Sequence, residues 1–312
     1  MTARRARACE PPRWNRLSGY FLRRFGERVR KIPLDAGFSC PNRDGTLGRE
    51  GCIFCNAQGS GTGLGENGLD LAGQWEFWRT QFQAKGVKLF MAYLQSFSNT
   101  YGPIERLAAV LDALAVLPGI VGLSIGTRPD CVDREKLELI AKQPQPERWI
   151  EFGAQSGNDA TLRRIRRGHD RAGVEQAVEA AAAAGLKVCV HLIAGLPGEG
   201  KNEFLDSVRW ISGQAVSGVK FHCLYVCRDT FLADLFTRGE FTPISRDSYI
   251  DIMADALVVL RPDIIVHRIA GDPSCEELLA PEWALQSSDT GNRLAAELIR
   301  RDARQGEKSA SR

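Results

Sequence analysis

The feature that most constrains the fold is a regular alternation of short apolar segments with longer helical patterns. Helical patterns occupy 103–117, 133–142 and 171–184, and the last ends at Gly185, a residue suited to the left-handed conformation that terminates a helix. Strands separated by helices of this length need right-handed crossovers and form a parallel sheet, which can close wholly or in part into a barrel. The segments that predict strands are 29–34, 87–94, 120–125, 149–154, 186–194, 219–226 and 263–269.

Three cysteines, Cys40, Cys52 and Cys55, form a cluster that requires a chemical explanation. Two residues separate Cys52 from Cys55, so both thiols can reach one metal centre, and the glycine- and proline-rich stretch before them lets Cys40 fold back to the same point. Three thiolates can bind three irons of a four-iron cluster or three positions of a zinc ion. Either alternative leaves one coordination position open, which is typical of a site that performs chemistry.

The position of this cysteine loop agrees with the predicted fold. It follows the strand at 29–34 directly, so it lies at the carboxyl ends of the strands. Barrels of parallel strands hold their reacting groups in the loops at that end. The glycine-rich segment 57–68 beside the cysteines is either a mobile lid or an ordinary flexible connection.

The composition fits an enzyme with one large α/β core. The chain has 312 residues, a formal net charge of +3 and nine cysteines, an odd number that favours metal binding and core packing over disulfides. So small a net charge does not by itself indicate a nucleic-acid or membrane partner. No apolar run is long enough to span a bilayer. Residues 1–18 are expected to form a flexible N-terminal tail, and 301–312 a disordered one.

Seven short motifs, each beginning near the end of a predicted strand, carry a family resemblance. With these motifs in this order, the chain resembles the radical S-adenosylmethionine (SAM) enzymes. It is most similar to the YhcC-like group, itself similar to the catalytic subunit of the Elongator complex, and the likeness runs from about Tyr20 to Leu294. The motifs are 31–38 (KIPLDAGF), the three cysteines, 95–101 (QSFSNTY), 126–130 (GTRPD), 153–157 (GAQSG), 167–169 (RGH) and 191–199 (HLIAGLPGE).

The resemblance implies an architecture and its boundaries. The expected fold is α/β, a partial TIM-type barrel of about six parallel β/α units with a C-terminal extension. The barrel is expected at 19–240, with the cluster loop at 36–68, and the extension at 241–300 is expected to pack on the barrel. An oxygen-sensitive cofactor and the missing targeting signals indicate a cytoplasmic location.

The resemblance also implies the cofactors and the reaction. Cys40, Cys52 and Cys55 are expected to hold a [4Fe–4S] cluster, whose fourth iron is chelated by the amine and carboxylate of SAM. One electron from the reduced cluster cleaves SAM to methionine and a 5′-deoxyadenosyl radical, which abstracts hydrogen from the substrate. An electron donor such as flavodoxin or ferredoxin is then the expected partner.

Site residues follow from the same resemblance, one motif at a time. Gln95 and Ser96 stand where the superfamily usually has a Gly-Gly motif, whose carbonyls accept the methionine amine. Gln155 matches the position that contacts polar groups of the cofactor. Arg167 matches the arginine that pairs with the methionine carboxylate. The alternative for Arg167 is a solvated basic helix face together with its arginine neighbours.

Further positions depart from or extend the family pattern. His191 stands where relatives often carry an Asp that contacts the ribose, and a satisfied core histidine is the alternative. Gly195 and Leu196 are expected to let the backbone approach the adenine, because a side chain at Gly195 would block it. Gly126 replaces a Glu of the Elongator relatives, so any ribose contact of that Glu is lost here or moved to another residue.

The remaining cysteines leave two interpretations open. Cys223 and Cys227 are four apart on one predicted strand, so both are expected to face the same side. With Cys189 or Cys275 they could bind a second cluster, but packing in the core is the preferred interpretation.

The substrate is not specified by these patterns. Because the Elongator relative acts on transfer RNA, tRNA or other RNA is the leading hypothesis, supported by the basic stretch 163–171 and the basic first thirty residues. A small metabolite or a peptide is the alternative substrate. A second hypothesis is a non-catalytic RNA- or partner-binding protein with a structural iron–sulfur cluster. A third is a zinc hydrolase on a barrel.

Overall fold

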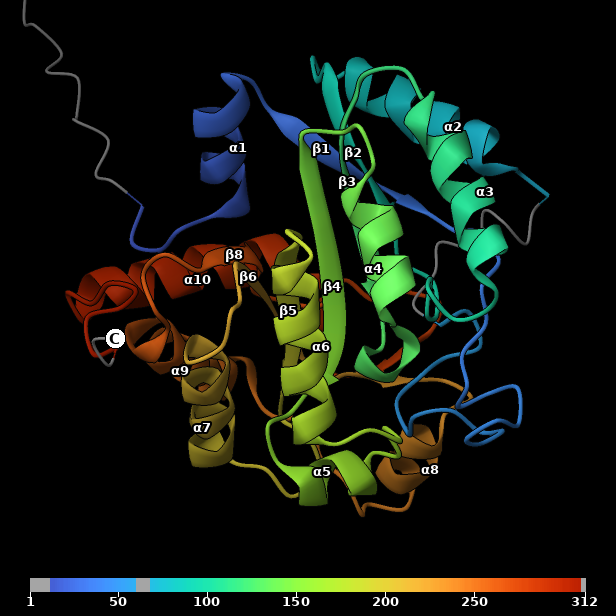
Figure 1. Ribbon diagram of the computed structural model, residues 1–312. Helices are drawn as coiled ribbons and strands as arrows, with labels where there is room; N and C mark the ends of the chain where they lie inside the picture. Colours follow the sequence, from blue (N-terminus) through green and yellow to red (C-terminus); the bar gives the residue numbers. More distant parts are fainter. Residues whose placement is uncertain (1–11, 60–67, 310–312) are drawn as a thin grey trace, which may run out of the picture.

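Seven strands form one parallel sheet that is curled into a half-barrel (Figure 1). The computed structural model describes residues 12–59 and 68–309. The sheet order β1-β2-β3-β4-β5-β6-β8 follows the chain, and within the described residues no pairing of β8 with β1 closes the barrel. The predicted partial barrel is therefore confirmed. The strands are β1 (Val29–Leu34), β2 (Leu89–Leu94), β3 (Ile120–Thr127), β4 (Glu147–Gln155), β5 (Lys187–Ala194), β6 (Gly218–Cys223) and β8 (Ile265–Arg268).

Helices make the crossovers between successive strands, and several begin at a side-chain cap. Asp70, Asp133 and Asp170 each accept a hydrogen bond from the backbone N–H three residues later, at the starts of α2, α4 and α6. None of the helices in the described part of the chain is long and apolar enough to cross a membrane. The helices are α1 (Leu17–Phe25), α2 (Leu71–Gln83), α3 (Ile104–Ala115), α4 (Arg134–Ala141), α5 (Asp159–Arg164), α6 (Arg171–Ala183), α7 (Lys201–Ser212), α8 (Phe231–Thr237), α9 (Arg246–Val259) and α10 (Ser287–Arg300).

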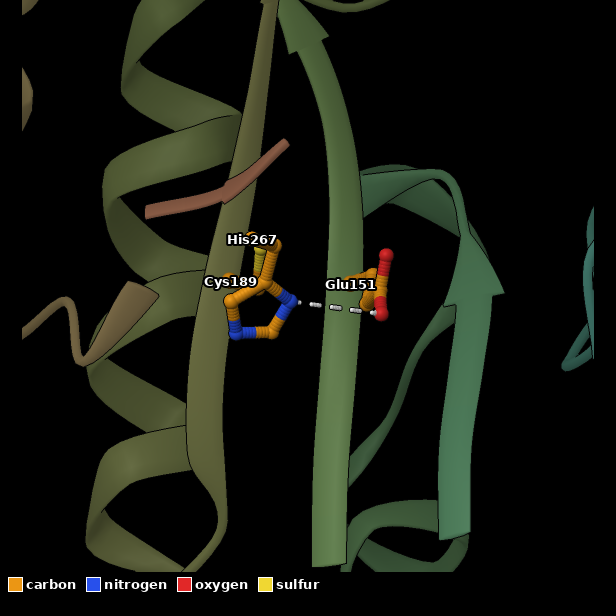
Figure 2. A group of neighbouring side chains, drawn as sticks. All are labelled: Glu151, Cys189 and His267. Carbon is orange, nitrogen blue, oxygen red and sulfur yellow. Dashed lines mark ion pairs between the residues drawn. The ribbon is translucent and has the colours of Figure 1, made fainter. Parts of the chain in front are cut away.

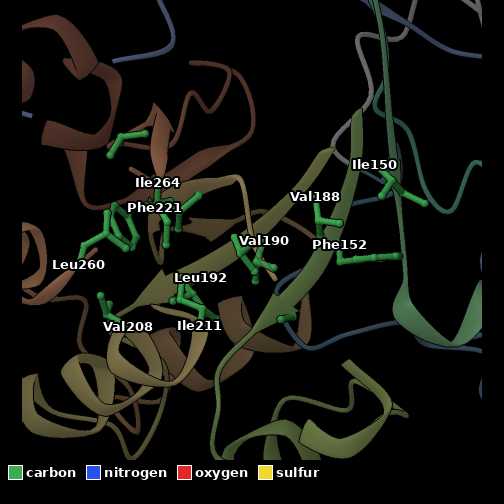
Figure 3. Close-up of a cluster of buried hydrophobic side chains, with 14 of the residues drawn as sticks. Ile150, Phe152, Val188, Val190, Leu192, Val208, Ile211, Phe221, Leu260 and Ile264 are labelled. Atoms are coloured by element: carbon green, nitrogen blue, oxygen red, sulfur yellow. The ribbon is translucent and has the colours of Figure 1, made fainter. Parts of the chain in front are cut away.

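The apolar core lies between the sheet and these helices (Figure 3). Along β4, Ile150 and Phe152 belong to this core, whereas Glu151 and Gly153 line a cavity on the inner side of the sheet. Successive side chains of a strand point to opposite faces, so one strand can supply both the core and the barrel interior. The same alternation repeats in β5 and β6, and it frees the inner face for polar residues.

The last strand packs beside the segments that lie nearest to the two ends of the described residues. Residues 12–16 run beside β8, where the Val266 N–H donates to the Asn15 carbonyl at 2.7 Å. Residues 301–309 continue from α10 along α9, with backbone bonds from Gly306 to Leu257 (3.0 Å) and from Lys308 to Val258 (2.9 Å). A small antiparallel pair, β7 (Val226–Cys227) with β9 (Leu278–Ala280), lies outside the main sheet.

Both predicted tails therefore need correction where the structure describes them. The expectation of a flexible tail over 1–18 does not hold for 12–18, because Trp14 is buried and Arg13 bonds the Ala303 carbonyl at 3.3 Å. The expected disorder of 301–312 does not hold for 301–309. These polar segments are held by backbone hydrogen bonds, which composition does not reveal. Residues 1–11 and 310–312 lie outside the described residues, as do 60–67 of the proposed lid.

We predict that the packing of α10 against the rest of the fold contributes several kcal/mol to the free energy of unfolding. Leu298 is fully buried, whereas its neighbour Ile299 is 55% exposed on the same helix. Leu298→Ala should lower the free energy of unfolding by about 2–5 kcal/mol, because it opens a cavity in the core. Ile299→Ala is the matched control and should change it by less than about 1 kcal/mol. Denaturant unfolding measures both, and equal effects would contradict this packing.

Candidate active site

The three cysteines of the predicted cluster line one cavity of about 570 Å³. The same cavity is lined by residues from all seven strands of the sheet, among them Tyr93 on β2, Glu151 on β4 and Arg268 on β8. It runs from the barrel interior to the loops at the carboxyl ends of the strands, where the fold class holds its reacting groups. The cysteine loop is thus placed at the predicted end of the barrel.

The backbone of the cysteine loop folds back on itself, as the spacing predicts. The Arg43 N–H donates to the Cys40 carbonyl at 2.8 Å, and the Cys55 N–H donates to the Cys52 carbonyl at 3.0 Å. The Arg43 guanidinium also donates to the Cys55 carbonyl at 2.8 Å and to that of Asn56. One arginine therefore ties the two ends of the loop together.

Two donors point at the sulfur of Cys52. The Arg167 guanidinium approaches it with Nη1 at 3.2 Å, and the Asn42 amide with Nδ2 at 3.5 Å. Burial, with the neighbouring Cys52, raises the pKa of the Cys55 thiol to about 11. Donors to sulfur favour the thiolate that a metal needs, and metal binding itself removes the thiol protons.

The sulfur positions distinguish between the two metal centres considered. A tetrahedral zinc ion with bonds of about 2.3 Å holds its ligand atoms within about 4 Å of one another. Among the described residues, one group of three such ligand atoms lies within 4.8 Å of one another, and it does not contain Cys40, Cys52 or Cys55. In an iron–sulfur cluster each thiolate binds its own iron, so the sulfurs lie farther apart. The separation of the three sulfurs therefore does not match a preformed site for a single tetrahedral ion.

Gln155 and Arg167 meet beside the cysteines at the end of β4. The β4–β5 register shifts between Gly153 and Gln155, and Gln155 adopts φ 76°, a left-handed conformation that is rare outside glycine. Arg167 is 7% exposed, and its Nη2 donates to the Gly153 carbonyl at 2.5 Å. A β-carbon on Gly153 would lie 2.8 Å from the Gln155 amide nitrogen, so a larger residue here would displace the Gln155 side chain. The solvated-face alternative for Arg167 is excluded.

The 95–98 loop brings one of its two predicted residues to the cavity. Gln95 lines the cavity, together with Phe97 and Ser98. Ser96 is buried instead, and its carbonyl accepts a hydrogen bond from the Asn99 amide at 3.0 Å. This bond uses one of the two lone pairs of the Ser96 carbonyl.

His191 lies in the cavity wall, but Gly195 and Leu196 do not. A β-carbon on Gly195 would meet the Ile244 side chain at 3.2 Å, and Leu196 packs in a separate apolar cluster. The reason expected for glycine at 195, that a side chain would block an adenine, is therefore not supported. Gly195 has φ 86°, so it is the turn after β5 that needs glycine there.

The barrel interior also holds a buried charge network that sequence reasoning missed. The Glu151 carboxylate accepts hydrogen bonds from Lys220 Nζ at 2.6 Å and from His191 Nε2 at 2.7 Å. Lys31 Nζ and the Ser124 hydroxyl also donate to it. The positive charges of Lys220 and Lys31 hold the pKa of Glu151 well below its usual value, although burial acts in the opposite direction. Charged residues in the middle of predicted buried strands were the available signal.

The same carboxylate belongs to the one group of three potential metal ligands noted above, with Cys189 and His267 (Figure 2). Two ammonium groups already contact Glu151, so a cation placed there would be repelled by both. Burial raises the pKa of the Cys189 thiol above its usual range, which keeps it protonated. The group is therefore part of the charge network rather than a metal site.

Cys223 and Cys227 do not share a strand face, so that expectation is wrong. Cys223 ends β6 in the main sheet, whereas Cys227 lies in β7 of the two-stranded sheet. The chain turns between them at Leu224 and Tyr225. Both cysteines are buried, as is Cys189, and Cys275 is exposed.

We predict that Glu151→Gln destabilises the fold strongly. The substitution leaves the ammonium groups of Lys31 and Lys220 in the barrel without a countercharge, which costs about 3–5 kcal/mol. Glu179→Gln, at an exposed position of α6, is the control and should stay within about 0.5 kcal/mol. Denaturant unfolding of the two variants measures the difference, and a similar small effect of both would contradict the network.

A second prediction concerns pH. Burial lowers the pKa of His191 to about 4, that of His267 to about 3 and that of His222 well below its usual value. Below about pH 6.5 the unfolded chain takes up protons at these rings and the folded protein does not, so stability falls as the pH falls. Each ring contributes about 1.4 kcal/mol per pH unit. The denaturation midpoint should drop between pH 6.5 and 4.5, and less steeply in His222→Gln.

Comparison with known proteins identifies the family. The model of the radical SAM superfamily matches residues 46–211, and that of the radical SAM C-terminal domain matches 216–300. Protein YhcC of Escherichia coli K12 is 37% identical over 274 residues, which cover 86% of this chain and 87% of that protein. A tRNA uridine(34) acetyltransferase of Dehalococcoides mccartyi is 26% identical over 155 residues, covering 49% of this chain and 33% of its own.

A solved structure agrees with this result. The archaeal Elp3 of Methanocaldococcus infernus, with an N-terminal deletion, superimposes with a TM-score of 0.69. It is 19% identical in sequence, and the match covers 89% of this chain and 64% of that one, so the likeness shows the shared fold. From the matched family models, the relative matched over most of its length and the half-barrel together, the chain belongs to the radical SAM superfamily and is a radical SAM enzyme.

Proposed function

We propose that the cavity holds a [4Fe–4S] cluster and SAM side by side, and that the enzyme abstracts a hydrogen atom from a substrate in the barrel. Three thiols, from Cys40, Cys52 and Cys55, face the cavity that Gln155 and Arg167 also line, and this observation carries the proposal. When bound, the reduced cluster supplies the electron that cleaves SAM to methionine and a 5′-deoxyadenosyl radical. With these three thiols as its ligands, the cluster would keep a fourth coordination position for the amine and carboxylate of SAM.

The polar residues of the cavity wall suit the remaining groups of SAM. Gln155 Oε1 is buried without a hydrogen-bond partner, so it can accept from a ligand donor such as an amine or hydroxyl. His191 donates through Nε2 to Glu151, and its neutral ring therefore presents Nδ1 as an acceptor, which suits a ribose hydroxyl. Arg167 supplies positive charge for a carboxylate.

The architecture also suits radical chemistry. The cavity lies on the inner face of a sheet whose outer face is covered by helices, so these helices shield it from solvent on that side. Exclusion of water and of other hydrogen donors protects a reactive radical. An external one-electron donor such as flavodoxin or ferredoxin completes the requirements.

For the substrate we propose tRNA or another RNA. The relative named as a tRNA uridine(34) acetyltransferase matches about half of this chain, which supports the proposal. Arg163 on α5 is exposed and available to a phosphate. Arg166 and Arg171 are already paired with Glu50 and Glu175, so their phosphate contacts would compete with these ion pairs.

The test is an anaerobic assay for SAM cleavage. The protein is reconstituted with iron and sulfide and reduced with dithionite, and 5′-deoxyadenosine is followed by chromatography after addition of SAM. Wild type should form it, and Cys52→Ala should form none because the cluster cannot assemble. Cys275→Ala is the matched control, since Cys275 is exposed and does not line the cavity.

Other outcomes identify the competing hypotheses. Cleavage that persists in Cys52→Ala overturns the ligand assignment. An intact cluster with no cleavage, even with bulk tRNA present, favours a non-catalytic binding protein. Bound zinc without sulfide favours a hydrolase. Under the RNA proposal, bulk tRNA should raise 5′-deoxyadenosine above the substrate-free amount, whereas nuclease-digested tRNA should not.

A further inference from the structure

The inner part of the cavity carries an excess of positive charge. Glu151 is shared between the ammonium groups of Lys31 and Lys220, so one carboxylate faces two cations. Arg268, at the end of β8, lines the same cavity and forms no ion pair with any described residue. Its Nη2 donates to His222 Nδ1 at 3.3 Å, and its Nε is buried without a hydrogen-bond partner. The guanidinium is therefore uncompensated.

Acidic groups at the mouth of the cavity do not supply the missing charge. Asp272 and Glu277 are the other carboxylates in the cavity wall. Asp272 is exposed to solvent. The two carboxylate oxygens of Glu277 accept hydrogen bonds from the Asn56 amide, at 3.0 and 2.9 Å.

The contact with Arg268 fixes the tautomer of His222. A guanidinium can only donate, so His222 Nδ1 must accept and the proton of the neutral ring lies on Nε2. His222 Nε2 is buried without a hydrogen-bond partner, which leaves an unsatisfied N–H donor. An unsatisfied buried donor costs about 1–3 kcal/mol, and an acceptor that enters the cavity recovers this energy.

Lys220 adds a third donor on the same strand. Lys220 lies two residues before His222 on β6, so both side chains point into the barrel. Its ammonium group donates to Glu151 and contacts the Tyr93 hydroxyl at 3.0 Å. An ammonium group has three N–H donors, so one beyond these two contacts is available for a ligand.

We propose that Arg268, His222 and Lys220 form an inner anion site that binds a carboxylate or phosphate of the substrate. The three groups present only donors, which matches a ligand group with only acceptors. The substrate class is then molecules with an anionic group on the part that enters the barrel. This inference rests on the proposed function, because it places the substrate beside SAM in the same cavity. The carboxylate of SAM is assigned to a different residue, Arg167, which contacts the end of β4.

The site can be tested without turnover by nitrogen NMR of the histidine rings. The chain has four histidines, so the labelled imidazoles of the reconstituted protein give few signals, and His222→Gln assigns that of His222. Sodium acetate, inorganic phosphate and neutral acetamide are titrated separately. We expect acetate or phosphate to shift the His222 signals saturably and acetamide to leave them unchanged. The anion that binds more tightly identifies the ligand group as carboxylate or phosphate.

Matched variants assign the binding to Arg268. Arg268→Gln should weaken the bound anion at least tenfold, and Arg268→Lys should weaken it less because the charge remains. Arg228→Gln removes the same charge from an exposed position outside the cavity wall and should leave the affinity unchanged. The signals of the other three histidines show whether each variant is folded.

Three outcomes would overturn the inner anion site. They are a His222 shift that never saturates, an equal loss of affinity in Arg228→Gln and Arg268→Gln, and loss of the anion-dependent shift when SAM is saturating. The last would assign these residues to SAM itself. Because the titration needs no cleavage of SAM, its result is independent of the 5′-deoxyadenosine assay, so failure of the site and failure of the proposed function can be told apart.

Discussion

The hydrogen bonds inside the barrel converge on one acceptor, the carboxylate of Glu151. Side chains from β1, β3, β5 and β6 donate hydrogen bonds to it: Lys31, Ser124, His191 and Lys220. A flat sheet would keep side chains of β1 and β6 well apart, since neighbouring strands are about 4.8 Å apart. The curl of the sheet brings these donors to one acceptor, so the shape of the half-barrel and its internal electrostatics support each other.

This arrangement sets the chemistry that the interior can support. A buried ion pair contributes little net stability after desolvation, but removal of one partner is costly, so the polar interior constrains the packing of the strands. It also keeps three histidines neutral, which turns them into directional donors and acceptors rather than charges. The cavity therefore has one side made of thiols and Arg167, and another made of cations and neutral imidazoles.

Much of the fold was predictable because it depends on local patterns. All seven predicted strand segments correspond to strands of the sheet, since runs of β-branched and aromatic residues between helices have few other solutions. Boundaries differed by a residue or two, as at β2, which begins at Leu89 rather than at 87. The segment 219–226 was predicted as one strand but divides into β6 and β7, because the chain turns between them.

The candidate site was predictable only in part, for a different reason. The cysteine spacing and the motifs at Gln155 and Arg167 are local, and the structure brings these residues to one cavity. The neighbour that a side chain at Gly195 would meet could not be predicted, because it is Ile244, which lies just before α9 and far along the chain.

The sequence by itself determined the alternation of strands and helices, the cysteine loop and the family, because each of these depends on short segments of the chain. Only the tertiary structure decided the charge network around Glu151 and the uncompensated Arg268. Those features arise where side chains from strands more than a hundred residues apart converge, as Lys31 and Glu151 do, 120 residues apart. Such convergence depends on the curvature and register of the whole sheet, which no local pattern specifies.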